Sequence, residues 1–268
     1  MKHLINLIEY LESNHHYSEV DRLVRIALDM TDVLEKENEL GGGSYGKFYS
    51  NFTSEQKRKL KDQIGNVPDN VGIKHFKERQ YNPMFGMIEN LKENLTFIYI
   101  APYINQKTDL VTPVYTGSLP LSAMITNKIN ITQKMSGETL FTINDKIVNR
   151  LGLSDWGTFN AIEDSIERNI KKKLNDIGVQ WTDCHAGNYL INKQVAQEFI
   201  EWTNNNTISK EMTFDLSRNA ALFDFGSFAV ESGTQPGQKL IKLREQMQSR
   251  PDNKFSQVIT KAIDEVVI

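Results

Sequence analysis

The sequence predicts an α+β protein in which a β-rich segment, residues 33–117, precedes a helical segment, residues 118–268. Two observations predict this. The first segment contains short runs rich in aromatic and β-branched residues, bounded by glycine and asparagine turns. The second contains long stretches with apolar residues at helical spacing, and residues 156–177 form the longest of them. A chain of 268 residues is long enough to form two lobes.

The first residues, 1–32, are expected to form a helical hairpin ahead of these two segments. Apolar residues recur at helical spacing in residues 3–12 and again in residues 18–29. The polar stretch 14–16 between them suits a turn, and Ser18 suits the start of the second helix. We therefore expect an N-terminal helical extension.

Elements of the β-rich segment follow from local signals. Residues 33–50 predict a strand, a glycine-rich turn and a second strand, and residues 53–64 predict a polar helix that begins at a Thr or Ser cap. A further strand is expected over 70–76, and a helix over 84–93 after Pro83. Two β-rich runs predict the last strands, with a hinge at 114–117; the runs are 94–104 and 109–117.

The helical segment is expected to contain a short strand after its longest helix. Helices are predicted over 119–129, 138–151, 156–177, about 238–248 and about 253–266. Gly178 is expected to end the longest helix, and residues 189–191 to form the strand. Residues 194–218 form an insertion with a turn at 204–206.

Composition limits the classes of partner. A net charge of -3 and a pI near 6.0 give no general electrostatic attraction to nucleic acid or to an anionic membrane. The single cysteine, Cys184, excludes an intrachain disulfide. No stretch approaches 18 consecutive apolar residues, so we expect a soluble, intracellular, cytoplasmic protein. The oligomeric state is not predicted.

Chemistry is expected at residues 178–191, GVQWTDCHAGNYLI. Asp183 and Asn188 are five residues apart, the separation between the catalytic base and the metal-binding asparagine in the kinase loop HRDxxxxN. The string that begins at Asp183 resembles the DxHxGN loop of aminoglycoside phosphotransferases and choline kinases, and the related loop of the ABC1 atypical kinases. The chain thus resembles the protein-kinase-like phosphotransferases.

Two further strings strengthen this resemblance because they occur in the family's order. Downstream, ALFDFG at 221–226 predicts a short buried strand that ends in a DFG motif. Upstream, LGGGSYGKF at 40–48 fits the glycine-rich pattern LGxGxxGxV. The resemblance implies a two-lobed kinase-like fold, with a β-rich N-lobe and a helical C-lobe, that binds ATP and Mg²⁺.

The resemblance assigns the nucleotide to the β-rich lobe. Three glycines would cover the phosphates and Phe48 would cover the base; the glycines are Gly41, Gly43 and Gly46. Lys74 ends a string, VGIK, that resembles the family's VAIK strand, so it is the candidate phosphate anchor. Glu89 is our choice for the glutamate that holds Lys74, with Glu78 and Glu93 as alternatives.

The remaining roles fall on the 183–188 loop and the DFG motif. Asp183 would orient the acceptor hydroxyl, as the family's Asp does. Asn188 and Asp224 offer the hard oxygen ligands that suit Mg²⁺. His185 is expected to brace the loop through hydrogen bonds.

The chain also departs from the family. Trp181 stands where the family usually has a histidine, so the loop must be braced by packing instead. No APE-like segment follows DFG, and the tail is short, so the acceptor is left open between a small molecule and a protein. An ATP- and Mg²⁺-dependent kinase is the leading interpretation. A pseudokinase that serves as a nucleotide-binding or scaffolding module, or an adenylyl transferase on the same fold, remains an alternative.

Overall fold

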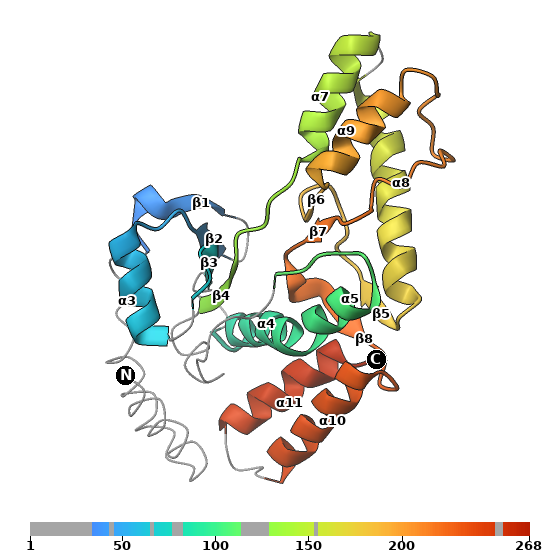
Figure 1. The fold of residues 1–268 in the computed structure, drawn as a ribbon. Coiled ribbons are helices and arrows are strands. Elements are labelled where there is room, and N and C mark those ends of the chain that lie inside the picture. The colour runs from blue at the N-terminus through green and yellow to red at the C-terminus, as the bar shows by residue number, and fades with distance from the viewer. Residues whose placement is uncertain are drawn as a thin grey trace. The chain divides into compact units, whose positions relative to one another are not determined.

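The computed structural model describes residues 34–42, 46–64, 67–76, 83–113, 129–152, 155–249 and 254–268 (Figure 1). The predicted hairpin, the predicted domain boundaries after residues 32 and 117, the hinge and most of the predicted helix 119–129 lie outside these ranges. The chain divides into two compact units. Unit 1 contains the described parts of residues 1–98, 114–134 and 244–264, and unit 2 contains those of 99–113, 135–243 and 265–268.

Unit 1 is built on a four-stranded antiparallel sheet with the order β1-β2-β3-β4. The strands are β1 (Glu39–Gly42), β2 (Gly46–Tyr49), β3 (Val71–Phe76) and β4 (Ile129–Gln133), and a short 3₁₀ helix (Lys36–Asn38) precedes β1. The first three strands confirm the sequence prediction. β4 was not predicted, because we assigned its first residue to the end of a helix.

Two helices of unit 1 form where the sequence predicts them. Helix α3 (Ser54–Ile64) begins with a reciprocal cap, in which Thr53 Oγ1 accepts the Gln56 N–H at 3.2 Å and Gln56 Oε1 accepts the Thr53 N–H at 2.9 Å. Helix α4 (Pro83–Leu95) buries Ile88, Leu91 and Leu95 and contacts β4. The apolar stripe of α4 therefore belongs to the core of the unit.

The strand expected over 94–104 is wrong. The chain stays helical there, through a π-helical turn (Thr96–Ile100) and then α5 (Ala101–Lys107). Its buried apolar residues follow a helical spacing with an additional residue at the π turn: Leu95, Phe97, Ile100, Ala101 and Ile104. The β-branched and aromatic composition suggested a strand, but burial against the core selected the helix.

Unit 2 contains two of the helices predicted for the second segment and one helix of that segment that was not predicted. Helices α7 (Leu140–Leu151) and α8 (Asp155–Asn175) match the predicted ranges closely, and Gly178 adopts a φ of 71° just beyond α8. Helix α9 (Lys193–Trp202) lies inside the expected insertion and was not predicted. Two more helices confirm those expected near the C-terminus: α10 (Gln235–Gln248) passes from unit 2 into unit 1, and α11 (Lys254–Val266) lies almost entirely in unit 1.

Short strand pairs surround the 183–188 loop. Strand β5 (Val179–Trp181) pairs antiparallel with β8 (Phe228–Val230), and β6 (Tyr189–Leu190) pairs antiparallel with β7 (Ala221–Leu222). A 3₁₀ turn, Phe225–Ser227, separates β7 from β8. The α+β class is therefore confirmed: the four-stranded sheet of unit 1 is antiparallel, and most of the remaining chain is helical.

Candidate active site

The loop that carries Asp183 is closed by the side chain of Asn188. Asn188 Nδ2 donates to the carbonyl oxygen of Asp183 at 2.9 Å and to Asp183 Oδ2 at 3.1 Å. Asn188 is buried, whereas the Asp183 side chain is 59% exposed. The two residues expected to act together are thus in direct contact, and the Asp183 carboxylate remains accessible from solvent.

His185 forms its own hydrogen bond within the same loop. Its Nδ1 accepts the Gly187 N–H at 3.0 Å, so the neutral imidazole carries its proton on Nε2. Nε2 lies 3.7 Å from Asp183 Oδ1. This hydrogen bond restrains the backbone of the loop, which is the effect of a bracing residue.

Strand pairing brings Asn188 close to Asp224. Tyr189 pairs with Leu222 at one end of the β6–β7 ladder. Asn188 and Phe223 are the next residues beyond that end, and the Phe223 N–H donates to the Asn188 carbonyl at 3.0 Å. Asp224 follows directly, with a left-handed backbone at φ 63°. Aspartate tolerates this conformation better than most residues do. The two predicted metal ligands therefore lie at one end of one strand pair.

Aromatic packing links the start of the loop to the DFG motif. Trp181 stacks on Phe228 with 4.8 Å between ring centroids, and Phe228 lies 4.6 Å from Phe225 of the motif. All three rings are buried. Trp181 is thus held in place by packing, and Phe228 is the partner that the sequence did not reveal.

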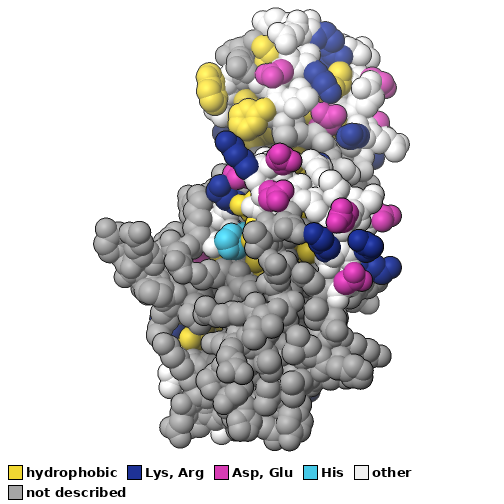
Figure 2. Space-filling model, turned by 90° about the vertical axis from the view of Figure 1, so that its left-hand side faces the viewer, with side chains coloured by type: hydrophobic (Ala, Val, Ile, Leu, Met, Phe, Trp, Pro, Cys, Tyr) yellow, Lys and Arg dark blue, Asp and Glu magenta, His cyan; other side chains and the backbone are white. Residues whose placement is uncertain are grey.

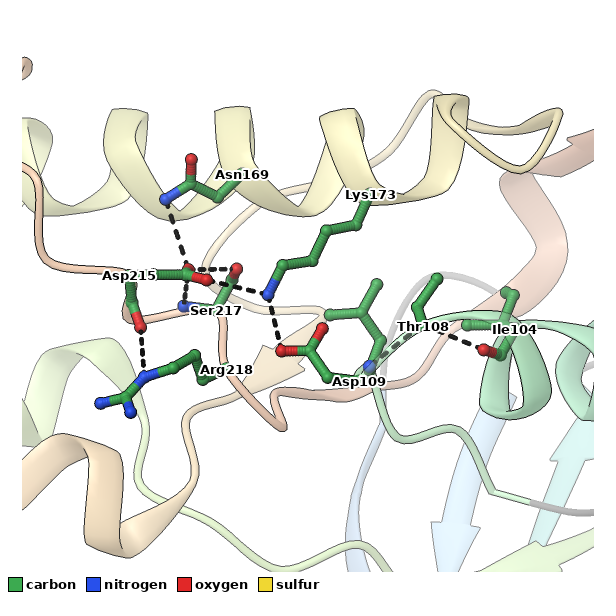
Figure 3. Close-up of polar contacts among 9 residues, drawn as sticks. Ile104, Thr108, Asp109, Asn169, Lys173, Asp215, Ser217 and Arg218 are labelled. Carbon is green, nitrogen blue, oxygen red and sulfur yellow. Dashed lines mark hydrogen bonds and ion pairs between the residues drawn. The ribbon is translucent and has the colours of Figure 1, made fainter.

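A polar network links α8 to two segments that lie next to β7 (Figure 3). Lys173 of α8 pairs with Asp109 at 2.9 Å and with Asp215 at 3.0 Å. Asp215 Oδ1 also accepts the Ser217 N–H at 2.9 Å, in the turn that leads into β7. Burial raises the pKa of Asp215, but hydrogen bonds from Ser217 and Lys173 outweigh burial and hold it below its ordinary value.

The segment after Asp109 joins β7 directly. The Val111 N–H donates to the Ala220 carbonyl at 2.9 Å, and the Leu222 N–H donates to the Val111 carbonyl at 2.8 Å. Lys173 therefore fixes both chain segments that meet in this bridge. The position of the strand that precedes Asp224 depends on contacts from three parts of unit 2.

The donor atoms suit Mg²⁺. Because Asn188 Nδ2 donates to Asp183, its Oδ1 is the amide atom left for a cation, and Asp224, two residues beyond the β6–β7 ladder, carries a carboxylate. Within the described ranges, no group of three or more His, Cys, Asp or Glu side chains is arranged to hold a metal ion. Mg²⁺ commonly takes one or two protein ligands and completes its shell with phosphate oxygens and water, so this set fits it.

In unit 1, Lys74 pairs with Glu93. The Nζ–Oε2 distance is 2.6 Å, and the two side chains are only 17% and 5% exposed. The choice of Glu89 is wrong: Glu89 pairs instead with Lys92 of its own helix, at 3.2 Å. The sequence places both glutamates on one face of α4, and only the packing of α4 decides which turn lies level with Lys74. Glu78 lies outside the described residues.

Phe48 and Gly72 share the sheet face that carries Lys74. Phe48 pairs directly with Lys74, and residues opposite each other in antiparallel strands point to the same side. The Phe48 ring covers Gly72 so closely that a Cβ there would lie 2.3 Å from its Cζ. Gly72 is a residue that sequence reasoning missed: its lack of a side chain makes room for a phenylalanine beside Lys74.

The glycine-rich turn is described in part. Gly41 lies in β1 and Gly46 in β2, and Gly43 lies outside the described residues. A Cβ on Gly46 would stand 2.6 Å from the His75 carbonyl oxygen. The close approach of β2 to β3 leaves no room for a side chain at position 46, which is a structural reason for glycine there.

Cys184 is a packing residue. Its side chain is buried, and burial raises the pKa of the thiol to about 12, with Glu167 acting in the same direction. The thiol therefore stays protonated at neutral pH.

The described surface mixes charges of both signs on the face that Figure 2 shows. Exposed large hydrophobic side chains include Trp156 and Phe141. Every described helix is too short or too polar to cross a membrane.

No family model matches the chain, and no curated protein matches it. Among solved structures, it is similar to a BubR1 kinase domain, with 16% identity and a TM-score of 0.34 over 84% of this chain and 60% of that chain. It is also similar to Rv3197 of Mycobacterium tuberculosis, solved with erythromycin, with 11% identity and a TM-score of 0.38 over 97% of this chain and 68% of that chain. The chain thus spans about 60% of the length of the BubR1 structure.

Proposed function

We propose that the protein is an ATP- and Mg²⁺-dependent phosphotransferase of the kinase-like type, acting on a hydroxyl of a small molecule or a protein. One observation carries the proposal. The β6–β7 pairing brings Asn188 and Asp224 to one end of a strand pair, and Asn188 also bonds to Asp183. A base and two hard oxygen ligands in this arrangement are what phosphoryl transfer requires of a protein.

Each residue of the loop has a distinct task in this mechanism. Asp183 accepts a hydrogen bond from the acceptor hydroxyl and orients it toward the transferred phosphoryl group. Asn188 and Asp224 hold Mg²⁺, which neutralises charge on the phosphates. The Asn188 contact fixes Asp183 Oδ2, so the exposed carboxylate has a defined orientation.

Lys74 is assigned to the phosphates. A lysine paired with a nearly buried glutamate keeps its ammonium group charged and in place. Phe48, on the same sheet face, is assigned to the base. Gly41, Gly43 and Gly46 are assigned to the phosphates by the resemblance.

A nucleotide-binding module without turnover is the second candidate. Trp181 is buried in an aromatic stack, and its Nε1 has no hydrogen-bond partner, so this position contributes no polar group to the loop. Retention of Asp183, Asn188 and Asp224 together favours the enzyme. An adenylyl transferase would use the same phosphate and metal ligands.

The decisive experiment compares thermal stability and turnover with Mg-ATP. Ligand at 100 times its dissociation constant stabilises a protein by about 2.7 kcal/mol. We expect this stabilisation in the parent and in Asp183→Asn, and its loss in Asp224→Ala. Asp176→Asn, an exposed substitution near the end of α8, serves as the matched control.

Turnover separates the candidate functions. Asp183→Asn is expected to lower the rate of transfer by about 10² to 10⁴, because it removes the positioned base. Mass spectrometry of the incubated protein and acceptors distinguishes phosphoryl from adenylyl transfer, at about 80 and about 329 Da. Stabilisation without any transfer would establish the binding module, and no stabilisation would contradict both candidates.

A further inference from the structure

Glu163 of α8 contacts the middle of the 183–188 loop. Its Oε1 accepts the backbone N–H of Ala186 at 3.0 Å, across 23 positions of sequence. Ala186 is buried, so this N–H has limited access to water. The hydrogen bonds of Asn188 and His185 join loop residues to each other, whereas Glu163 joins the loop to a helix.

Helix α8 is a rigid support for this contact. It runs over 21 residues, and its core face is fully buried at Ile162, Ile166, Ile170 and Leu174. A carboxylate that accepts a backbone N–H forms a charge-assisted hydrogen bond, which is stronger than a bond between neutral groups. Glu163 therefore holds the loop backbone in a fixed position relative to a helix that is packed into the core.

The contact lies between the two residues that the proposed reaction needs most. Asp183 stands three residues before Ala186, and Asn188 stands two residues after it. A shift of Ala186 would move both ends of the Asn188–Asp183 hydrogen bonds. Positioning errors of about 1 Å are enough to lower an enzymatic rate by about 10²-fold.

We propose that Glu163 is a positioning residue for the phosphoryl transfer: it holds the loop by accepting the Ala186 N–H, so that Asp183 and Asn188 keep their mutual orientation. This inference rests on the proposed function. It gives the loop a polar brace from α8, in a chain where Trp181 replaces the usual histidine.

Three substitutions separate the hydrogen bond from the charge. Glu163→Gln keeps an acceptor oxygen at the same distance along the side chain and removes the charge. Glu163→Asp keeps the charge but shortens the side chain by one methylene, which withdraws the carboxylate from Ala186. Glu163→Leu removes both. Asp164→Asn, the neighbouring residue whose carboxylate pairs with Lys210 at 2.5 Å, is the control.

Two readouts are needed: hydrogen exchange of the peptide that contains Ala186, and steady-state kinetics with Mg-ATP as the substrate and water or the protein itself as the acceptor. We expect Glu163→Asp and Glu163→Leu to exchange faster at the loop and to lose about 10- to 100-fold in kcat, with KM for Mg-ATP within about threefold. Glu163→Gln keeps a weaker, neutral hydrogen bond and should therefore lose less than Glu163→Asp in both readouts, and the control should resemble the parent.

The exchange arm is independent of turnover. Parent-like exchange in Glu163→Asp would overturn the brace even if the enzyme is active, and so would a Glu163→Gln variant as impaired as Glu163→Asp. If the parent shows no transfer at all, the proposed phosphotransfer fails, and with it the catalytic part of this inference. Exchange would then still decide whether Glu163 holds the loop.

Discussion

Removal of Glu93 is expected to destabilise the protein far more than removal of Glu89. Lys74 Nζ and Glu93 Oε2 are 2.6 Å apart, and at an effective dielectric constant of about 20 their attraction is about 6 kcal/mol. Desolvation of two nearly buried groups offsets part of this attraction. Loss of one partner from such a pair costs about 3 to 5 kcal/mol, because the other charge stays buried and uncompensated.

Glu89 provides the matched control on the same helix. It pairs with Lys92 at 3.2 Å with i,i+3 spacing, and its side chain is 15% exposed where that of Glu93 is 5% exposed, so its loss should cost about 1 to 3 kcal/mol. Urea denaturation should therefore give a free energy of unfolding that is lower for Glu93→Gln than for Glu89→Gln, by about 2 kcal/mol. The double variant Lys74→Met/Glu93→Leu should recover most of the loss, because it leaves no buried charge.

Equal destabilisation by Glu93→Gln and Glu89→Gln would refute the assignment of Glu93 as the partner of Lys74. A double variant less stable than Glu93→Gln would also refute the reasoning, because the cost would then come from lost packing. The same variants test the proposed function. Lys74→Met should lose the stabilisation by Mg-ATP, and Glu89→Gln should keep it.

Three further predictions concern single side chains. Because the folded state holds the pKa of Asp215 below its ordinary value, its contribution to stability is present above about pH 4 and is lost as pH falls through the lower, folded-state pKa; urea midpoints of the parent and Asp215→Asn should therefore converge in acid. Cys184 should resist iodoacetamide at pH 8 in the native state and react in urea, since burial raises its pKa to about 12; rapid native labelling would contradict this. Gly72→Ala should cost about 1 to 3 kcal/mol by crowding the Phe48 ring, and Phe48→Val should restore most of that loss; an additive double variant would show that the two residues do not touch.

The sequence alone determined the elements that depend on local interactions. Thr53 and Gln56 cap α3 through contacts three residues apart, and the apolar period of 156–177 is long enough to define α8 by itself. Gly178 ends that region because a left-handed backbone suits glycine. The loop string from Asp183 to Asn188 is also local, since its closing hydrogen bonds span five residues.

Tertiary structure decided what depends on partners distant in sequence. Residues 94–104 have strand-like composition, and only burial against the core makes them helical. Glu93 rather than Glu89 meets Lys74, because helix packing decides which turn of α4 lies level with β3. Asn188 and Asp224 come together only through β6–β7 pairing across more than thirty residues of sequence, and Glu163 reaches Ala186 from another element. A residue pattern specifies side-chain types at fixed spacings, but the free energy that selects partners between elements comes from their shared burial.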